Sequence, residues 1–115
     1  MEPMPTAPAS DFLHGTLDVL ILKTLSWGPR HGYAIARWLE TGSGAGLQIE
    51  DGSLYPALYR LERKGWIEAE WGVTETKRKA KFYRLSRAGR EHLRRQTAQW
   101  VEFSAAVSRI LVPAP

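Results

Sequence analysis

The side chains with the clearest chemical use in this sequence are arginines, lysines and tyrosines, which gather in the stretches 53–64 and 77–83. Arginine can donate hydrogen bonds to guanine edges or to phosphate, and lysine and tyrosine can bind phosphate. Both stretches therefore suit a nucleic-acid partner. Together with two ring-bearing residues at an earlier helix start, the candidate DNA-binding residues are His31, Tyr33, Ser53, Tyr55, Pro56, Tyr59, Arg60, Arg63, Lys64, Lys77, Arg78, Lys79, Lys81 and Tyr83.

Positive charge is concentrated in one part of the chain. The 115 residues include 16 Lys and Arg against 12 Asp and Glu, a net charge of +4. Between Gly52 and Arg95 there are twelve basic and five acidic residues, so the remainder is net acidic. A basic segment of this kind favours an anionic partner.

The residue patterns of enzymes and metal sites do not occur. The sequence has no cysteine, and His14, His31 and His92 lie far apart without a metal-ligand neighbour at helical or turn spacing. The glycine-rich loop 42–46 lacks the Gly-Lys-Ser/Thr ending of a phosphate-binding loop, and no Gly-x-Ser-x-Gly sequence is present. We expect no enzyme, no cofactor and no metal.

Residues 51–65 have the pattern of a short helix that could enter the major groove of DNA. Because each residue advances about 100° around a helix, Leu54, Leu58 and Leu61 fall on one side and face the core. The tyrosines and cations fall on the opposite side and its flanks, where a duplex could contact them. Pro56 is tolerated because it lies in the first turn.

A basic β-hairpin is expected to follow this helix. Its strands are the runs 66–71 and 80–85, and in the first the alternation of Ile67, Ala69 and Trp71 with polar residues is typical of a half-buried strand. The cations at 77–79 lie in the connecting loop. A groove-binding helix followed by a basic wing is a complete way to hold a duplex, so the pattern predicts a winged helix-turn-helix.

Each of these groups also has a purely structural interpretation. Tyr55 and Tyr59 could be ordinary half-buried aromatics. Arg63 and Lys64 could be solvated side chains that the helix dipole favours at a C-terminus. A basic loop is usually solvated as well, but its place in a wing favours phosphate contact.

The earlier part of the chain supplies the remaining core. Residues 11–26 and 32–40 predict two helices, and 47–49 could add a third strand to the hairpin. The first ten residues, with three prolines, predict a disordered tail. The apolar run 17–25 is too short to span a bilayer, so we expect a cytoplasmic protein that does not enter a membrane.

The last helix is predicted to begin at the N-cap Ser86 and to end near Leu111. It spans about 40 Å, which is longer than one small core can cover. Its apolar stripe therefore implies a partner, most simply a second copy that places two recognition helices about 34 Å apart. The candidate dimer-interface residues are Leu13, Leu17, Leu20, Leu93, Trp100, Phe103, Val107 and Ile110.

Trp100 has two interpretations that differ in kind. It could be packed in the core of the dimer interface. Alternatively, Trp100 and its symmetry mate could line a slot for a small flat aromatic effector, whose binding would reorient the two DNA-binding halves. Both interpretations place Trp100 at the dimer interface.

Four blocks of the sequence carry a resemblance to a known family. They are His31–Ile35, Gly52–Leu58, Arg78–Ser86 and Ala88–Arg90, and together, in this order, they resemble the signature blocks of the PadR family of bacterial transcriptional regulators. The resemblance implies a winged helix-turn-helix, a homodimer and repression at palindromic operators. It also implies the short subfamily, in which a single C-terminal helix dimerises against the first helix of the partner. Phe82 stands where many relatives have a tyrosine.

The predicted fold is mainly α with a small β-hairpin: a winged helix-turn-helix plus a long C-terminal dimerisation helix. We expect a tail at 1–10, a DNA-binding domain at 11–89, the dimerisation helix at 86–111 and a tail at 112–115. The predicted function is a sequence-specific, double-stranded DNA-binding repressor, released by an aromatic effector at the dimer interface.

Two other functions fit the same fold. A winged-helix protein–protein interaction module without DNA-sequence specificity is the main alternative. A single-stranded RNA binder is a third, in which Trp71, Phe82 and Tyr83 would stack on bases. A steep loss of affinity with salt would favour DNA over a protein partner.

Overall fold

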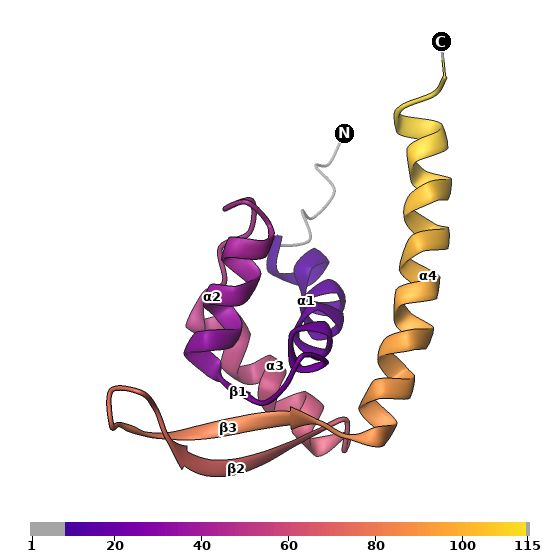
Figure 1. The fold of residues 1–115 in the computed structure, drawn as a ribbon. Helices are drawn as coiled ribbons and strands as arrows, with labels where there is room; N and C mark the ends of the chain where they lie inside the picture. The colour runs from indigo at the N-terminus through magenta and orange to yellow at the C-terminus, as the bar shows by residue number, and fades with distance from the viewer. Residues whose placement is uncertain (1–8, 115) are drawn as a thin grey trace.

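The computed structural model describes residues 9–114, with side chains from residue 15 onward, as four helices and a three-stranded antiparallel sheet (Figure 1). The predicted class, mainly α with a winged helix-turn-helix and a long C-terminal helix, is confirmed. The helices are α1 (Ala9–Leu25), α2 (Gly32–Gly42), α3 (Asp51–Arg63) and α4 (Arg87–Leu111), and the strands are β1 (Arg30–His31), β2 (Ile67–Val73) and β3 (Lys79–Leu85).

The core lies where α1, α2 and α3 meet above the sheet (Figure 1). The leucines expected to face inward from α3 do so, since Leu54, Leu58 and Leu61 have no exposed surface. The helix ends where predicted. Gly65 adopts φ +76°, a left-handed conformation that glycine accepts without strain, and the Trp66 N–H donates back to the Leu61 carbonyl at 3.1 Å.

The sheet has the strand order β1-β3-β2. In the hairpin Ile67 pairs with Leu85 and Ala69 with Tyr83. Directly paired residues point to the same face, so Tyr83 lies on the same inward face as Ile67. The strands extend further than predicted, which leaves Thr74–Arg78 as the turn at the wing tip.

The prediction of a third strand at 47–49 is wrong. The third strand is β1, whose Arg30 and His31 pair with Tyr83 and Phe82. Residues 47–49 are held differently, because the Ile49 N–H donates to the Glu40 carboxylate at 3.1 Å and the Ile49 side chain is buried. A carboxylate thus replaces the strand partner that this segment lacks.

The C-terminal helix begins as expected and leaves the body of the fold. Ser86 is its N-cap, and its hydroxyl accepts from the Gly89 N–H at 3.0 Å. Among the described residues of α4, only Gly89 and Leu93 are buried, and the rest of the helix stands beside α1 as a long shaft (Figure 1). The molecule therefore extends 53 Å in its longest direction.

The predicted tails lie mostly outside the described residues. Residues 1–8 and 115 are not described, while Ala9 and Ser10, expected in the tail, already belong to α1. The side chain of Leu13 is also outside the described part. No described helix combines the length and apolarity that crossing a membrane requires.

Candidate nucleic-acid interface

The solvent-facing strip of α3 is made of Pro56, Tyr59 and Arg63, which recur at helical spacing opposite the leucines. Tyr59 is 61% exposed, and the Arg63 guanidinium lies 5.8 Å from the centre of its ring. An exposed aromatic ring beside a cation can contact both a base and the backbone of a duplex. This strip is the part of α3 best placed to enter a groove.

The flanks of α3 are partly occupied by neighbours. Arg60 forms an ion pair with Asp18 of α1 at 3.0 Å, which draws its side chain toward α1. On the same flank Ser53 is half-buried, and Lys64 lies 4.8 Å from the Trp66 ring. Tyr55 points to the other flank, where its ring packs closely against Gly32: a Cβ at that glycine would lie 3.0 Å from the ring. Ser53 and Arg60 are therefore less available to DNA than the strip of Pro56, Tyr59 and Arg63, whereas Tyr55 and Lys64 remain exposed.

The wing tip is a closed turn that exposes its cations. The Lys77 N–H donates to Thr74 O at 2.8 Å, and the Thr74 N–H donates to Arg78 O at 2.8 Å. Lys77 adopts φ +62°, and Lys77, Arg78 and Lys79 are all exposed. Lys79, predicted in the loop, is the first residue of β3, and with the two cations of the turn it forms a surface suited to phosphate.

Two predicted DNA contacts on β3 have other partners. Tyr83 is only 6% exposed, and burial raises the pKa of its hydroxyl above the ordinary value. The prediction that Tyr83 contacts DNA, or stacks on RNA bases, is therefore wrong: the strand register turns it into the core. Lys81 is half-buried and its ammonium lies 3.3 Å from Glu62, so part of its charge is already compensated.

His31 and Tyr33 lie at the start of α2. The His31 Nδ1 accepts from the Ala34 N–H at 3.2 Å and so caps the helix. The imidazole packs edge-on against Phe82 at 5.3 Å, while the Tyr33 side chain is 68% exposed. His31 was expected at a helix start, but histidine is not a usual N-cap residue, so its type alone did not predict this hydrogen bond.

A second surface lies between α1 and α4, where the dimer interface was predicted. Leu17 is wholly buried within the protomer and Leu93 is nearly so, hence neither is available to a partner, and that part of the prediction is wrong. Leu20 and Val107 are half-buried, and the apolar side chains of Trp100, Phe103 and Ile110 are exposed.

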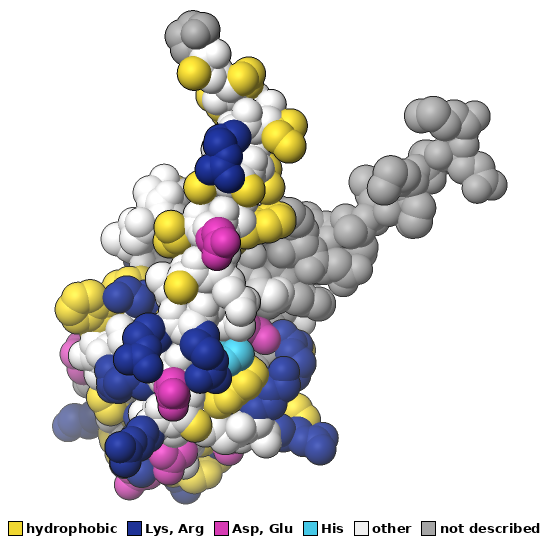
Figure 2. Space-filling model, turned by 90° about the vertical axis from the view of Figure 1, so that its right-hand side faces the viewer, with side chains coloured by type: hydrophobic (Ala, Val, Ile, Leu, Met, Phe, Trp, Pro, Cys, Tyr) yellow, Lys and Arg dark blue, Asp and Glu magenta, His cyan; other side chains and the backbone are white. Residues whose placement is uncertain are grey.

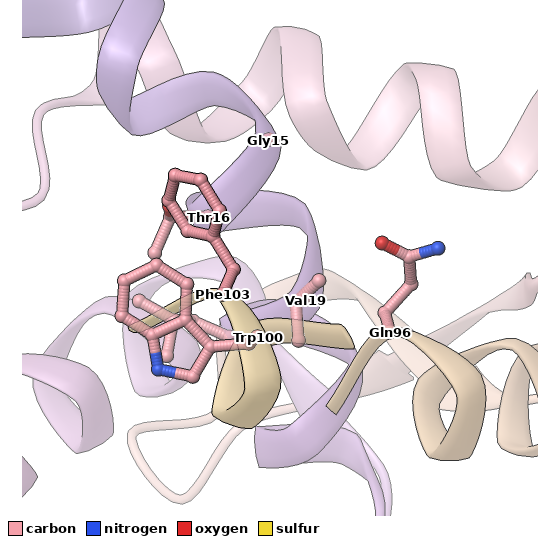
Figure 3. A pocket seen from close by; sticks show the side chains of 7 residues that line it. Gly15, Thr16, Val19, Gln96, Trp100 and Phe103 are labelled. Carbon is pink, nitrogen blue, oxygen red and sulfur yellow. The ribbon is translucent and has the colours of Figure 1, made fainter. Parts of the chain in front are cut away.

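An open groove of about 470 Å³ lies between these two helices. Trp100 and Phe103 lie close together on its α4 side, with ring centres 6.4 Å apart, facing Thr16 of α1 (Figure 3). Gly15, Thr16, Val19 and Gln96 also line it and were missed at the sequence level. Helical spacing from Leu20 and Trp100 would have pointed to Thr16 and Gln96, each four residues earlier.

Arginines gather at the base of α4. They belong to the basic segment noted in the sequence, but no DNA contact was predicted for them. Figure 2 shows basic side chains over the base of the helix and apolar side chains along its shaft. The exposed members are Arg87, Arg90, Arg94 and Arg95, of which the last two lie within 4.0 Å of Glu91. The two halves of α4 thus present different chemistry.

A tight joint connects α4 to the end of α3. The Ser86 N–H donates to Trp66 O at 3.0 Å, and the Ser86 hydroxyl donates to Gly65 O at 2.6 Å. His92 stacks on Trp66 with ring centres 3.6 Å apart. Burial in this stack lowers the pKa of His92, and the neighbouring Arg95 and Lys64 lower it further.

No group of three or more His, Asp or Glu side chains within the described part of the chain could hold a metal ion.

A three-helix body with an exposed third helix and a basic hairpin beside it is the winged helix-turn-helix fold of DNA-binding proteins. The chain belongs to the transcriptional regulator PadR-like family, whose model matches residues 21–95. Members of this family are transcriptional regulators and not enzymes.

Relatives and solved structures agree with this assignment. The chain is 33% identical over 93 residues to an uncharacterized protein of Lysinibacillus sphaericus, covering 81% of this chain and 85% of that protein. A transcriptional regulator from Clostridium thermocellum superposes with a TM-score of 0.78 at 27% identity, covering 86% of this chain and 96% of that one. A PadR family regulator from Eggerthella lenta gives a TM-score of 0.74 at 33% identity, with coverages of 92% and 90%.

Proposed function

We propose that this transcriptional regulator binds double-stranded DNA, with α3 in the major groove and the β2–β3 wing over the neighbouring backbone. PadR regulators bind DNA and typically act as dimers. The observation that supports the proposal most directly is the exposed strip of Tyr59 and Arg63 on a fold whose wing tip exposes Lys77, Arg78 and Lys79. The strip can read base edges while the wing neutralises phosphates.

The test is selection of bound fragments from the host genome, followed by gel retardation of a selected fragment at several salt concentrations. We expect retardation that weakens steeply with salt, because each neutralised phosphate releases counterions. A chain that retards no fragment at low ionic strength would contradict DNA binding. It would leave the protein-interaction module as the better interpretation of the wing.

The oligomeric form proposed is a homodimer that represses at a palindromic operator. The apolar shaft of α4 supports it, because Phe103 and Ile110 are 60% and 80% exposed among the described residues and a second copy would cover them. A twofold dimer would place the recognition helices on successive major-groove faces, about 34 Å apart. Repression follows if the operator overlaps a promoter, and a reporter gene downstream of the selected fragment would measure it.

A small flat aromatic effector is proposed for the groove between α1 and α4. Trp100 and Phe103 present aromatic faces there, beside the apolar Val19 and Leu20. A compound bound between two such rings would change how the protomers pack and so the distance between their recognition helices. Titration of flat aromatic compounds against tryptophan fluorescence tests this, with Trp100→Phe as the variant in which quenching at this site should disappear. Quenching that is identical in the variant would remove the groove as the effector site.

A further inference from the structure

A second groove lies on the opposite side of the helical body, between α2, β1 and the wing turn. Its volume is about 720 Å³, and its lining includes Arg30, His31, Tyr33, Arg37, Trp38 and Glu75. Two guanidinium groups, an imidazole and two aromatic rings thus share one open surface with a single carboxylate. Arg30, Arg37 and Trp38 were not among the residues predicted to bind a partner.

The cations of this groove lack carboxylate partners. Within the described part of the chain, neither Arg30 nor Arg37 forms an ion pair within 4.0 Å, whereas Arg60, Lys81 and Arg84 all do. The Nε of Arg30 is buried and has no described hydrogen-bond acceptor. Its guanidinium lies over the Trp38 ring at 6.0 Å. An unsatisfied buried donor is unfavourable. Because this Nε is closed to solvent, an external acceptor would bind the terminal nitrogens of the guanidinium.

Further donors line up with these guanidinium groups. Because His31 Nδ1 accepts the cap hydrogen bond from Ala34, the proton of the neutral imidazole is on Nε2, which is free to donate. Tyr33 is 68% exposed, and Arg37 follows it by one helical turn on the same side of α2. The donors are therefore spread along an edge, which suits successive phosphates better than one compact anion.

The groove is also continuous with the surface proposed to bind DNA. Gly32 packs directly against the Tyr55 ring, which ties the start of α2 to α3. At its other end the groove reaches Glu75, two residues from Lys77 in the wing turn. A strand passing from the recognition helix to the wing would cross the start of α2.

We propose that this groove holds the sugar–phosphate backbone of the operator strand that runs between α3 and the wing, with the terminal guanidinium nitrogens of Arg30 and Arg37 donating to its phosphates. The inference rests on the proposed DNA-binding function and adds to it two phosphate contacts. A guanidinium suits this role because its fork of N–H groups matches phosphate oxygens. The Glu75 carboxylate lies at the edge of the same groove, so its negative charge should weaken the binding of phosphates there.

The experiment measures duplex affinity against salt concentration for the full chain and three variants. Arg37→Gln and Arg30→Gln should each weaken operator and unrelated duplexes by the same factor and lower the slope of log affinity against log salt by about 0.9. Glu75→Gln should strengthen binding several-fold, and it changes an exposed residue. The matched controls are Arg109→Gln and Glu102→Gln, which change exposed residues of the same charges on the shaft of α4.

The outcomes separate the two claims. If the wild-type chain binds a duplex with a steep salt dependence and all three groove variants match their controls, the groove assignment is overturned and the proposed function stands. If the wild-type chain binds no duplex, both fail. Should Arg30→Gln lose its folded circular dichroism spectrum, Arg37→Gln and Glu75→Gln still decide the question, because both residues are exposed.

Discussion

At the scale of single residues, the arginines of α3 differ by what already binds them. Arg60 is held by Asp18 at 3.0 Å, while Arg63 is exposed, lies beside the Tyr59 ring and forms no ion pair with a described residue. A guanidinium engaged by a carboxylate must lose that partner before it can bind DNA. Helical spacing placed both arginines opposite the leucines, but it could not show a partner 42 residues earlier in the chain.

We therefore expect Arg63→Ala to weaken operator binding more than Arg60→Ala does. If Arg63 reads a base, the loss should be about 1–3 kcal/mol, with relaxed preference at one operator position. Gel retardation of the operator and its single-base variants measures this. A larger loss for Arg60→Ala would show that the ion pair opens on binding.

The ion pair can be tested in the free protein. A double-mutant cycle of Asp18→Ala and Arg60→Ala should give a coupling of about 0.5–1 kcal/mol in urea unfolding, because both side chains are partly exposed and solvent screens the pair. Effects that simply add would mean that the pair contributes nothing to stability. The half-buried position of Asp18 would then need an explanation other than this ion pair.

Lys79 belongs to the wing, and its exposed charge should act without regard to sequence. We expect Lys79→Ala to weaken all duplexes alike and to lower the salt slope by about 0.9, one phosphate contact. Affinities for operator and unrelated duplexes, measured side by side, check this. A changed preference for the operator would contradict a pure backbone contact and would give the wing a role in sequence recognition.

Among the helices and strands, residue types near each end predicted most boundaries. Pairing between distant segments determined the others. The end of α3 at Gly65 and the N-cap of α4 at Ser86 depend on local residue types, and both lie where expected. Strand β1 has only two residues, which is too short for a hydrophobic periodicity to predict it. It forms by pairing with the free edge of β3. The orientation of Tyr83 likewise depends on register with β2, since pairing with Ala69 turns it inward.

The proposed binding surface could likewise be predicted only in part. The exposed strip of α3 and the cations of the wing follow from helical spacing and from the position of a loop. The groove of Arg30 and Arg37 could not be found that way, because it forms where α2 and the wing turn meet. Charge in one segment is visible in a sequence, whereas the absence of a carboxylate partner is visible only in three dimensions.

The joint between α3 and α4 depends on close contact at Gly89. A Cβ at this position would overlap the carbonyl oxygen of Trp66, which is backbone and cannot move aside. We expect Gly89→Ala to lower the free energy of unfolding by about 1–3 kcal/mol, measured by urea denaturation. Gly15→Ala is the matched control, because it lies in α1 with open space around it and should raise stability by roughly 0.5–1 kcal/mol. Equal stability of the Gly89→Ala chain and the wild type would contradict a tight joint.

The His92–Trp66 stack makes this joint sensitive to pH. Burial, then Arg95 and Lys64, lower the pKa of His92 below its ordinary 6.5, while Asp18 opposes the shift. Between that value and the lower folded-state pKa, the unfolded chain binds more protons than the folded one. The stabilising contribution is therefore complete above pH 6.5 and is lost as the pH falls through the folded-state pKa.

Urea unfolding at about pH 8 and about pH 5 measures this dependence. We expect the wild-type chain to lose more stability between the two conditions than His92→Gln, which has no titrating group in the stack. The other histidines are common to both chains and cancel in the comparison. If the free energy of unfolding changes equally with pH in both chains, the stack on Trp66 does not oppose protonation of His92.

Across the molecule as a whole, α4 connects the proposed site of association on its shaft to the proposed site of DNA contact in the winged-helix body. Basic side chains cover its base and apolar ones its shaft (Figure 2). The joint at Ser86 and Gly89 fixes the shaft to the end of α3. The packing of two shafts would therefore set the distance between two recognition helices, and a change in that packing would reach the DNA through rigid elements.

Trp100 is the side chain on which association should depend most. It is 47% exposed in the protomer and lies beside Phe103, in the centre of the apolar face. Tryptophan is enriched among interface hot spots, whose truncation costs about 2 kcal/mol or more, so we expect Trp100→Ala to raise the dimer dissociation constant by about 30-fold or more. Sedimentation equilibrium measures the constant, and Gln99→Ala, an exposed polar neighbour on another side of the helix, should leave it unchanged. A Trp100→Ala chain that still dimerises tightly would show that Phe103 and Ile110 hold the shafts together without it. The Trp100 ring would then be free to face a ligand, which is the condition that the effector proposal requires.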